Sequence, residues 1–243
     1  MNMMSIDHDN TQSDPADDAA ERFVGYFGYG SLVNRATLRT RFVSHHPAQL
    51  AGWRRVWRQR PNIGFASELP LPLALLSVEP AHDSIIDGAV IVDRSGNISS
   101  VDARERFYAR RPLKKTALSL TRPSEALPNP CDVHVYQALP QAELDALGQP
   151  EKSNHAGMSI PDQKPSLILQ SYLDAVLQGF FRAFGHEGAS RFVNETGNFD
   201  SAIVSDRRQP LYPRAVEILP GERRLFDRLL EERGVHYVSP PGE

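Results

Sequence analysis

The sequence has little cysteine and no long hydrophobic run. Its 243 residues hold a single cysteine, Cys131, which excludes an internal disulfide and fits a reducing compartment. We interpret Cys131 as a buried apolar side chain, because nothing near it in the sequence would stabilise a thiolate. No apolar run approaches the about 20 residues that span a bilayer. We therefore expect no membrane partner and a cytoplasmic location.

The chain also lacks an excess of charge of either sign. With 27 basic and 30 acidic residues, its net charge of −3 gives no footprint for nucleic acid. A local basic run alternates beside Trp53 and Trp57, and this alternation predicts the solvated face of a strand more than a binding patch. The run comprises Arg54, Arg55, Arg58 and Arg60.

Several common functional motifs are missing. None of the eight histidines has a spacing with cysteine or carboxylate that suits zinc, so we expect no metal. The pair His45-His46 is interpreted as part of a solvent-facing loop. The sequence has no phosphate-binding loop, no dinucleotide-binding glycine pattern and no nucleophilic serine elbow. We therefore expect neither a nucleotide cofactor nor serine-hydrolase chemistry.

The chain divides into three parts by composition. Residues 1–20 are rich in aspartate and lack the apolar centre of a signal peptide, so we predict a disordered acidic tail. Residues 21–137 are predicted to form a core, and residues 138–243 a helical extension packed on it. The strands expected after the first are Ala48–Trp57 with a bulge or a close approach at Gly52, Leu73–Val78, Ile85–Val92, Lys115–Leu120, Asp132–Gln137 and Ala215–Leu219. The expected helices are Asn34–Arg41, Ser99–Tyr108, one capped by Ser166 and ended by Gly185, Glu187–Glu195 and Glu222–Arg233.

The order of these elements predicts the fold class. Within residues 21–137, six short strands with only two helices between them do not form a repeating strand–helix–strand pattern. We therefore predict an α+β fold with a mixed, partly closed, small barrel-like β-sheet flanked by helices.

The most informative stretch is a turn near the start of the predicted core. The apolar run Phe23–Phe27 predicts a strand that stops at Gly28, Tyr29, Gly30, Ser31 and Leu32. Two glycines allow positive φ and a close approach to a ligand, and backbone N–H groups between a strand and a helix can hold a carboxylate. The same residues also fit a plain turn in which Ser31 caps a helix.

Four pieces of the sequence, in order, resemble the gamma-glutamylcyclotransferase superfamily, and its ChaC-type members most. They are the substrate loop at Phe27–Leu32, the second strand at Leu50–Trp57, the strand Gly88–Ile91 and the Leu-x-x-Arg-Glu-x-x-Tyr-like helix at Val101–Tyr108. Phe184–Val193 loosely resembles the family's C-terminal helices. The resemblance implies the family's fold, a small-molecule gamma-glutamyl substrate and no cofactor. Its reaction cyclises the gamma-glutamyl group to 5-oxoproline and releases the attached amine.

The resemblance also assigns roles to residues. The substrate's own α-amine attacks its δ-carbonyl, so a protein nucleophile is not needed, but a base and hydrogen-bond donors are. Glu105 is implied as the base, and it would then protonate the leaving nitrogen. A free glutamate is too acidic for this task, so the role requires apolar surroundings. The substrate loop would hold the substrate, and Tyr108 and Arg214 are further candidates for the pocket wall.

Other interpretations of the same residues stay open. Glu105 lies three residues after Asp102, which fits a capping box at a helix start, and Arg104 and Arg106 could pair with it at the surface. Pro61–Phe65 replace the His-Arg-Gly-Thr stretch of ChaC-type enzymes, so glutathione specificity is not implied. The alternatives are a catalytically inactive module that binds gamma-glutamyl compounds or 5-oxoproline, and an enzyme of the same fold acting on gamma-glutamyl amines. The sequence does not indicate the oligomeric state.

Overall fold

The computed structural model describes residues 22–39, 41–60, 69–122, 124–140, 143 and 166–240. The acidic tail predicted at residues 1–20 and most of the segment between residues 138 and 165 lie outside these ranges. Within the described ranges, no helix is long and apolar enough to cross a membrane.

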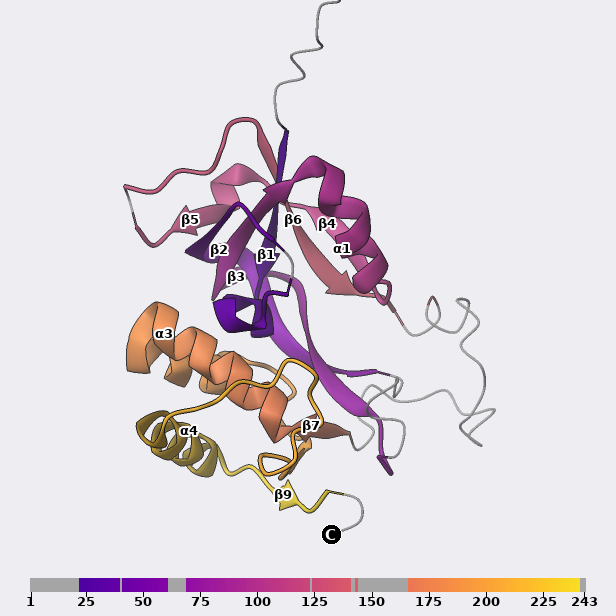
Figure 1. The fold of residues 1–243 in the computed structure, drawn as a ribbon, viewed down its shortest axis with the longest axis vertical. Coiled ribbons are helices and arrows are strands. Elements are labelled where there is room, and N and C mark those ends of the chain that lie inside the picture. The colour runs from indigo at the N-terminus through magenta and orange to yellow at the C-terminus, as the bar shows by residue number, and fades with distance from the viewer. Residues whose placement is uncertain are drawn as a thin grey trace, which may run out of the picture.

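One mixed β-sheet organises the described part of the chain (Figure 1). One path through it has the order β4-β6-β1-β3-β7-β8-β9, while β2 pairs with both β3 and β5. The path ends at β4 and β9, so the α+β class with a mixed sheet is confirmed, but the sheet is not closed. The strands are β1 (Phe23–Gly28), β2 (Ser44–Arg60), β3 (Leu73–Arg94), β4 (Tyr108–Pro112), β5 (Leu118–Leu120), β6 (Cys131–Ala138), β7 (Leu167–Leu169), β8 (Ala202–Val204) and β9 (Tyr237–Val238).

The long strand β3 lies between β1 and β7 in the sheet and pairs antiparallel with the long strand β2. Gly52 has a φ of +81°, and the register shifts between Ala51 and Trp53, which confirms the predicted bulge. The strands predicted at Leu73–Val78 and Ile85–Val92 form the single strand β3, because its pairing with β2 resumes beyond the bulge. The C-terminal end of β3, residues 89–94, pairs with β1, and Leu73 at the start of β3 pairs with Leu167 of β7.

The helices of the core are shorter than predicted. The helix expected at Ser99–Tyr108 is α1 (Ile98–Arg104), and Tyr108 already begins β4. The helix expected at Asn34–Arg41 is a single 3₁₀ turn, η2 (Arg35–Thr37), which follows another, η1 (Ser31–Val33). The other 3₁₀ turns in the described ranges are η4 (Ser95–Asn97) and η5 (Lys115–Ala117).

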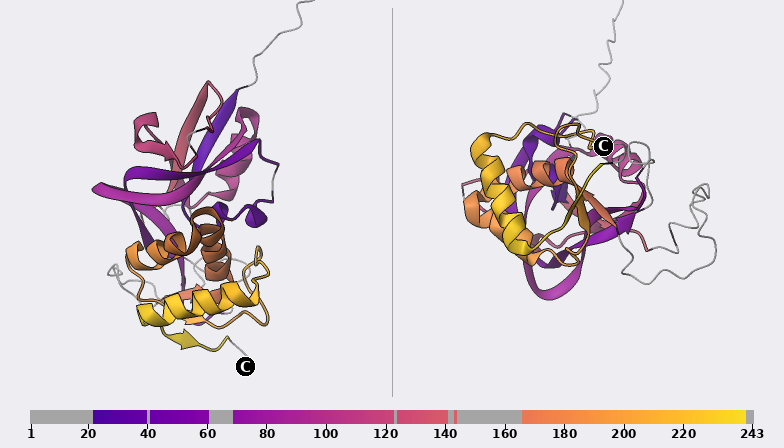
Figure 2. Two further views of the ribbon diagram at one scale, coloured as in Figure 1. Left: turned by 90° about the vertical axis from the view of Figure 1, so that its left-hand side faces the viewer. Right: turned by 90° about the horizontal axis from the view of Figure 1, so that it is seen from below.

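The C-terminal part contains two long helices that lie side by side in Figures 1 and 2. Helix α3 (Gln170–Glu195) begins later than predicted, because the residues after Ser166 pair as β7. Gly185 has a φ of 69° and kinks α3, so the two helices predicted on either side of it meet there. Helix α4 (Pro220–Arg233) agrees with the sequence, whereas the strand predicted at Ala215–Leu219 is not formed.

The main hydrophobic core combines side chains from the sheet and from both C-terminal helices. Cys131 is buried as predicted, and burial raises the pKa of its thiol. His45 and His46 lie in β2 and not in a loop, which corrects the sequence interpretation. His46 contacts Ser44 Oγ at 2.8 Å and a Glu125 carboxylate oxygen at 2.6 Å, so it fastens the segment before β6 to β2.

Candidate active site

The predicted substrate loop leaves β1 and passes directly into η1. Its glycines are required by close packing: a Cβ atom on Gly28 would lie 2.8 Å from Leu32 Cβ, and one on Gly30 would lie 3.1 Å from the Tyr172 hydroxyl oxygen. Neither glycine has a positive φ, which corrects the conformation expected from the sequence. Glycine therefore allows the loop to approach its neighbours here, and it supplies no left-handed turn.

The loop is fixed against α3. Asn34 Nδ2 donates to the carbonyl oxygen of Ala175 and to Gln178 Oε1, both at 2.9 Å. Thr37 Oγ1 donates to the carbonyl oxygen of Ser31 at 2.7 Å. Gly30 precedes η1 without a side-chain cap, so Ser31 is not the cap of the plain-turn interpretation. The first backbone hydrogen bond of η1 runs from the Val33 N–H to the Gly30 carbonyl, so the N–H groups of Ser31 and Leu32 precede it and have no acceptor within the turn.

A buried arginine of β2, Arg55, donates a hydrogen bond to the backbone of the substrate loop. Arg55 is 2% exposed, and its Nε donates to the carbonyl oxygen of Tyr29 at 2.7 Å. Its guanidinium carbon lies 4.7 Å and 4.9 Å from the ring centroids of Phe180 and Phe192 in α3. Burial lowers the pKa of Arg55 to about 10, although Asp87 opposes this shift. The prediction that the basic run lies on a solvated face is therefore wrong at Arg55.

The loop's serine contacts the segment between β8 and α4. Tyr212 donates its hydroxyl hydrogen to Ser31 Oγ at 2.9 Å, and Arg214 Nη2 lies 3.5 Å from the same oxygen. The guanidinium carbon of Arg214 lies 5.5 Å from the centre of the Tyr212 ring. Two predicted site residues, Ser31 and Arg214, are thus brought together across 183 positions of sequence.

Four tyrosines from four parts of the chain gather beside this serine. We call Tyr29, Tyr108, Tyr172 and Tyr212 the tyrosine cluster. The rings of Tyr172 and Tyr212 meet edge to face with centroids 5.0 Å apart. Burial raises the pKa of all four hydroxyls, to about 12 for Tyr108. The cluster therefore offers neutral hydroxyl groups in a poorly hydrated setting.

Glu105 lies at the end of α1, next to this cluster. Its N–H donates to the carbonyl oxygen of Val101, so it ends the helix, and the capping-box interpretation is wrong. After burial, the negative charge of Glu105 is a further cause that raises the pKa of each hydroxyl in the cluster. Its side chain is 21% exposed and contacts Arg104 Nε at 3.0 Å. The ion pair considered from the sequence is therefore present, beside the tyrosines.

Leu76 of β3 connects the two halves of the candidate site. Its carbonyl oxygen accepts a hydrogen bond from the Tyr108 hydroxyl at 3.1 Å, and the Tyr108 N–H donates to the carbonyl oxygen of Glu105. A Cβ on Gly30 would lie 3.0 Å from Leu76 Cδ1. The turn that carries Glu105 and the loop that carries Gly30 therefore both lie against the same residue, Leu76.

Sequence reasoning missed four residues of this arrangement. Neither Tyr172 of α3 nor Tyr212 is among the site residues predicted from the sequence. Their hydroxyl groups were the available signal, because a buried tyrosine oxygen usually needs a polar partner. Arg55 and Arg60 were assigned to a solvated face, but they are 2% and 6% exposed.

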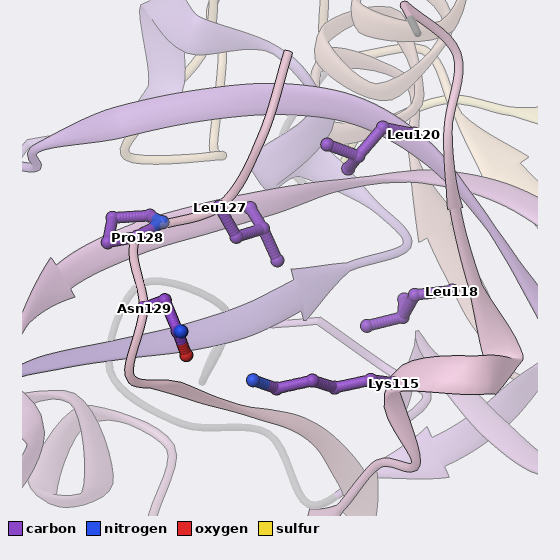
Figure 3. A pocket seen from close by; sticks show the side chains of 6 residues that line it. All are labelled: Lys115, Leu118, Leu120, Leu127, Pro128 and Asn129. Carbon is purple, nitrogen blue, oxygen red and sulfur yellow. The ribbon is translucent and has the colours of Figure 1, made fainter.

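The two described cavities lie elsewhere. One of about 370 Å³ lies between β5 and the segment before β6, and Figure 3 shows Lys115 and Asn129 on one side of it and three leucines on the other. Another of about 430 Å³ is lined in part by Ser171, Asp174 and Arg207. No residue of the tyrosine cluster lines either of them, so neither is used in assigning a function. Among the described residues, no three His, Cys, Asp or Glu side chains come together in a way that could hold a metal ion.

Comparison with known proteins adds a likeness of fold. No family model and no curated protein matches this sequence. Gamma-glutamyl cyclotransferases are among the similar solved structures: one has 12% identity and a TM-score of 0.45 over 85% of this chain and 99% of its own. A glutathione-specific one from yeast has 12% identity and a TM-score of 0.39 over 86% and 96%. An uncharacterised protein from Homo sapiens has 11% identity and a TM-score of 0.43 over 85% and 99%. The TM-scores of these three structures are below 0.5.

Proposed function

We propose that this protein is a gamma-glutamyl cyclotransferase that converts a gamma-glutamyl peptide or amine to 5-oxoproline and a free amine. One observation carries the proposal: the carboxylate implied as the base by the sequence resemblance belongs to the turn that leads into the half-buried Tyr108, and its charge acts on the buried Tyr29, Tyr172 and Tyr212, the last of which bonds to Ser31 of the implied substrate loop. These two sequence motifs are 74 positions apart, counted as 105 − 31, and nothing in the hydrophobic pattern requires them to meet.

Glu105 is the proposed base. The substrate's α-ammonium first loses a proton to the Glu105 carboxylate, and the free amine attacks the δ-carbonyl carbon. The new carbon–nitrogen bond closes a five-membered ring, and the carbonyl oxygen carries the negative charge of the tetrahedral intermediate. The original amide bond then breaks, Glu105 returns its proton to the leaving nitrogen, and the ring nitrogen releases its second proton to the solvent, which gives neutral lactam and free amine. The bent substrate supplies its own nucleophile, so the protein contributes position and proton transfer.

The loop and the tyrosine cluster are the proposed binding surfaces. Ser31 Oγ and Arg214 are suited to the α-carboxylate of the gamma-glutamyl group, because a guanidinium and a hydroxyl donate together to a carboxylate. The N–H groups at the start of η1 supply further donors. Because the Tyr29, Tyr108 and Tyr212 hydroxyls donate to other groups, the neutral Tyr172 hydroxyl is the member of the cluster proposed to stabilise the oxyanion. The rings exclude water from the reacting bond.

The test is a panel of gamma-glutamyl dipeptides and amides, with release of 5-oxoproline as the measurement. Glu105→Gln keeps the size of the side chain and removes the base, so turnover should fall by about 10²- to 10⁴-fold. The matched control is Glu187→Gln, since the Glu187 side chain is 88% exposed and lies on α3. Full turnover by Glu105→Gln would remove the base assignment. Binding of 5-oxoproline without turnover of any substrate would favour the inactive binding module.

A further inference from the structure

Arg60, the last residue of β2, is a buried cation with unused hydrogen-bond donors. It is 6% exposed, and its Nη1 donates to the carbonyl oxygen of Leu139 at 3.2 Å. Its Nε and Nη2 are buried and have no hydrogen-bond partner among the residues that the structure describes. No carboxylate among the described residues pairs with it within 4.0 Å.

The surroundings of Arg60 place it at the Glu105 side of the tyrosine cluster. Its guanidinium carbon lies 5.5 Å from the centre of the Tyr108 ring. The two side chains influence each other's pKa, yet the contact does not meet the geometry of a hydrogen bond. The N–H of Leu139, which holds Arg60, donates to the carbonyl oxygen of Phe107 in the turn that follows Glu105. Arg60 and Glu105 are therefore both tied to this short turn.

A guanidinium in this situation is suited to binding an anion. Removing a charge from water is expensive, and a buried charge is normally compensated by an opposite charge with hydrogen bonds. Burial accordingly lowers the pKa of Arg60. The neighbouring Tyr29 and Tyr108 hydroxyls donate to carbonyl oxygens and carry no charge. The two open donors Nε and Nη2 lie on one edge of the guanidinium, which matches the two oxygens of a carboxylate.

We propose that Arg60 binds a carboxylate on the leaving group of the substrate, so that the site selects gamma-glutamyl amino acids and peptides over gamma-glutamyl amines. This inference rests on the proposed cyclotransferase function. Arg214 and Ser31 meet at Tyr212, whereas Arg60 lies against Tyr108 next to Glu105. Because Glu105 returns its proton to the leaving nitrogen, the group on that nitrogen lies on the Arg60 side. Each of the two cations thus serves one carboxylate.

The decisive pair of substrates is gamma-glutamylalanine and gamma-glutamylethylamide, which differ only by the carboxylate on the leaving amine. Wild-type protein should favour the dipeptide by about 10- to 100-fold in kcat/KM, the size of a charge-assisted hydrogen bond. Arg60→Met should remove most of this preference by raising KM for the dipeptide, and Arg60→Lys should retain part of it. The control is Arg54→Met on the same strand, where the side chain is 61% exposed. It should leave the ratio unchanged.

Each outcome bears on Arg60 separately from the proposed reaction. Equal kcat/KM for the two compounds in wild-type protein overturns the inference, whether or not Arg60→Met folds. An equal loss for both compounds in Arg60→Met overturns it too. If no compound is cyclised, the anion site at Arg60 is tested by measuring the binding of the same two compounds by calorimetry. If the dipeptide binds more tightly than the amide and Arg60→Met abolishes this difference, the anion site is supported although the proposed reaction fails. Equal binding of the two compounds, or no binding, rejects both the anion site and the proposed reaction.

Discussion

Tyr212 donates a hydrogen bond to Ser31 Oγ across 181 positions of sequence, and this contact joins the C-terminal part of the chain to the substrate loop. Tyr212 is 7% exposed, and its ring packs edge to face on Tyr172 of α3. The segment that precedes α4 therefore covers the loop and contributes to the environment of its serine.

Tyr212→Phe should weaken substrate binding without disturbing the fold. The phenylalanine keeps the ring contact with Tyr172 and removes only the hydroxyl that orients Ser31. Loss of one such hydrogen bond should lower kcat/KM by about two- to tenfold. Steady-state kinetics on a gamma-glutamyl dipeptide measure this, with Tyr237→Phe as the control because Tyr237 is 43% exposed. An unchanged kcat/KM in Tyr212→Phe would show that Tyr212 does not orient Ser31.

Gly179→Ala should destabilise the protein, against the usual preference for alanine in a helix. Alanine in a helix is normally more stable than glycine by about 0.5–1 kcal/mol. At position 179, however, a Cβ would lie 2.6 Å from the backbone nitrogen of Asn34 and 2.9 Å from its Cα. Backbone atoms cannot move aside cheaply, so helix α3 must shift from the loop. We expect a net loss of about 1–3 kcal/mol in the free energy of unfolding, measured in urea.

The control for this substitution is Gly96→Ala. A Cβ on Gly96 meets nothing within 4 Å, and its φ is not positive. It should change the free energy of unfolding by less than about 0.5 kcal/mol. Similar values for the two variants would mean that α3 does not rest directly on the loop.

The sequence predicts the loop and Glu105 as candidate site residues because their motifs are local. Gly28, Gly30 and Ser31 stand within four positions, and the strand before them follows from a short apolar run. The end of α1 was misplaced, since the pattern around Glu105 fits a helix of any length up to Pro112. Only tertiary pairing of Tyr108 with Ala138 of β6 shows that a strand starts there.

The direction of the basic side chains could not be found from the sequence. A strand alternates its faces with a period of two, so Arg54 and Arg55 must point to opposite sides. Sequence alone does not show that α3 covers one of these sides with Phe180 and Phe192, more than a hundred residues later. Tyr172 shows the same limit: the spacing of apolar residues in α3 predicts that its side chain is buried, as it is, but not which loop its hydroxyl approaches.

Arg207→Met should destabilise the C-terminal part strongly. Arg207 donates through Nε and Nη2 to both oxygens of Asp174, at 2.6 Å and 2.7 Å, and through Nη1 to Asp227 at 2.6 Å. These hydrogen bonds outweigh burial and raise the pKa of Arg207. Asp174 in α3 is only 4% exposed, so removing the arginine leaves its charge buried without compensation. The expected loss is about 3–5 kcal/mol in the free energy of unfolding.

The adjacent Arg208→Met serves as the control for Arg207, because Arg208 is exposed. It should change the stability by less than about 0.5 kcal/mol. The double variant Arg207→Met/Asp174→Leu should recover most of the loss, since it removes both charges. A single variant as stable as wild-type protein would contradict a structural role for this ion pair.

The stability of the protein should fall as the pH decreases below about 6.5, in part through His45. Burial lowers the pKa of His45 from 6.5, although its Nε2 bonds to the carbonyl oxygen of Leu32 at 3.2 Å. The unfolded chain then binds a proton at a higher pH than the folded protein does. The contribution of His45 is therefore fully present above its unfolded pKa and is lost as the pH falls through its lower folded pKa.

Replacing His45 by glutamine should flatten this dependence. The glutamine amide can still donate to Leu32, but it does not titrate. Free energies of unfolding at pH 7.5, 6.5 and 5.5, values chosen about the histidine pKa, should show a smaller decrease in His45→Gln than in wild-type protein. Part of the decrease should remain, because burial also lowers the pKa of His134. His82→Asn should leave it unchanged, since the His82 side chain is 98% exposed. An identical decrease in His45→Gln and wild-type protein would mean that His45 takes up its proton equally in both states.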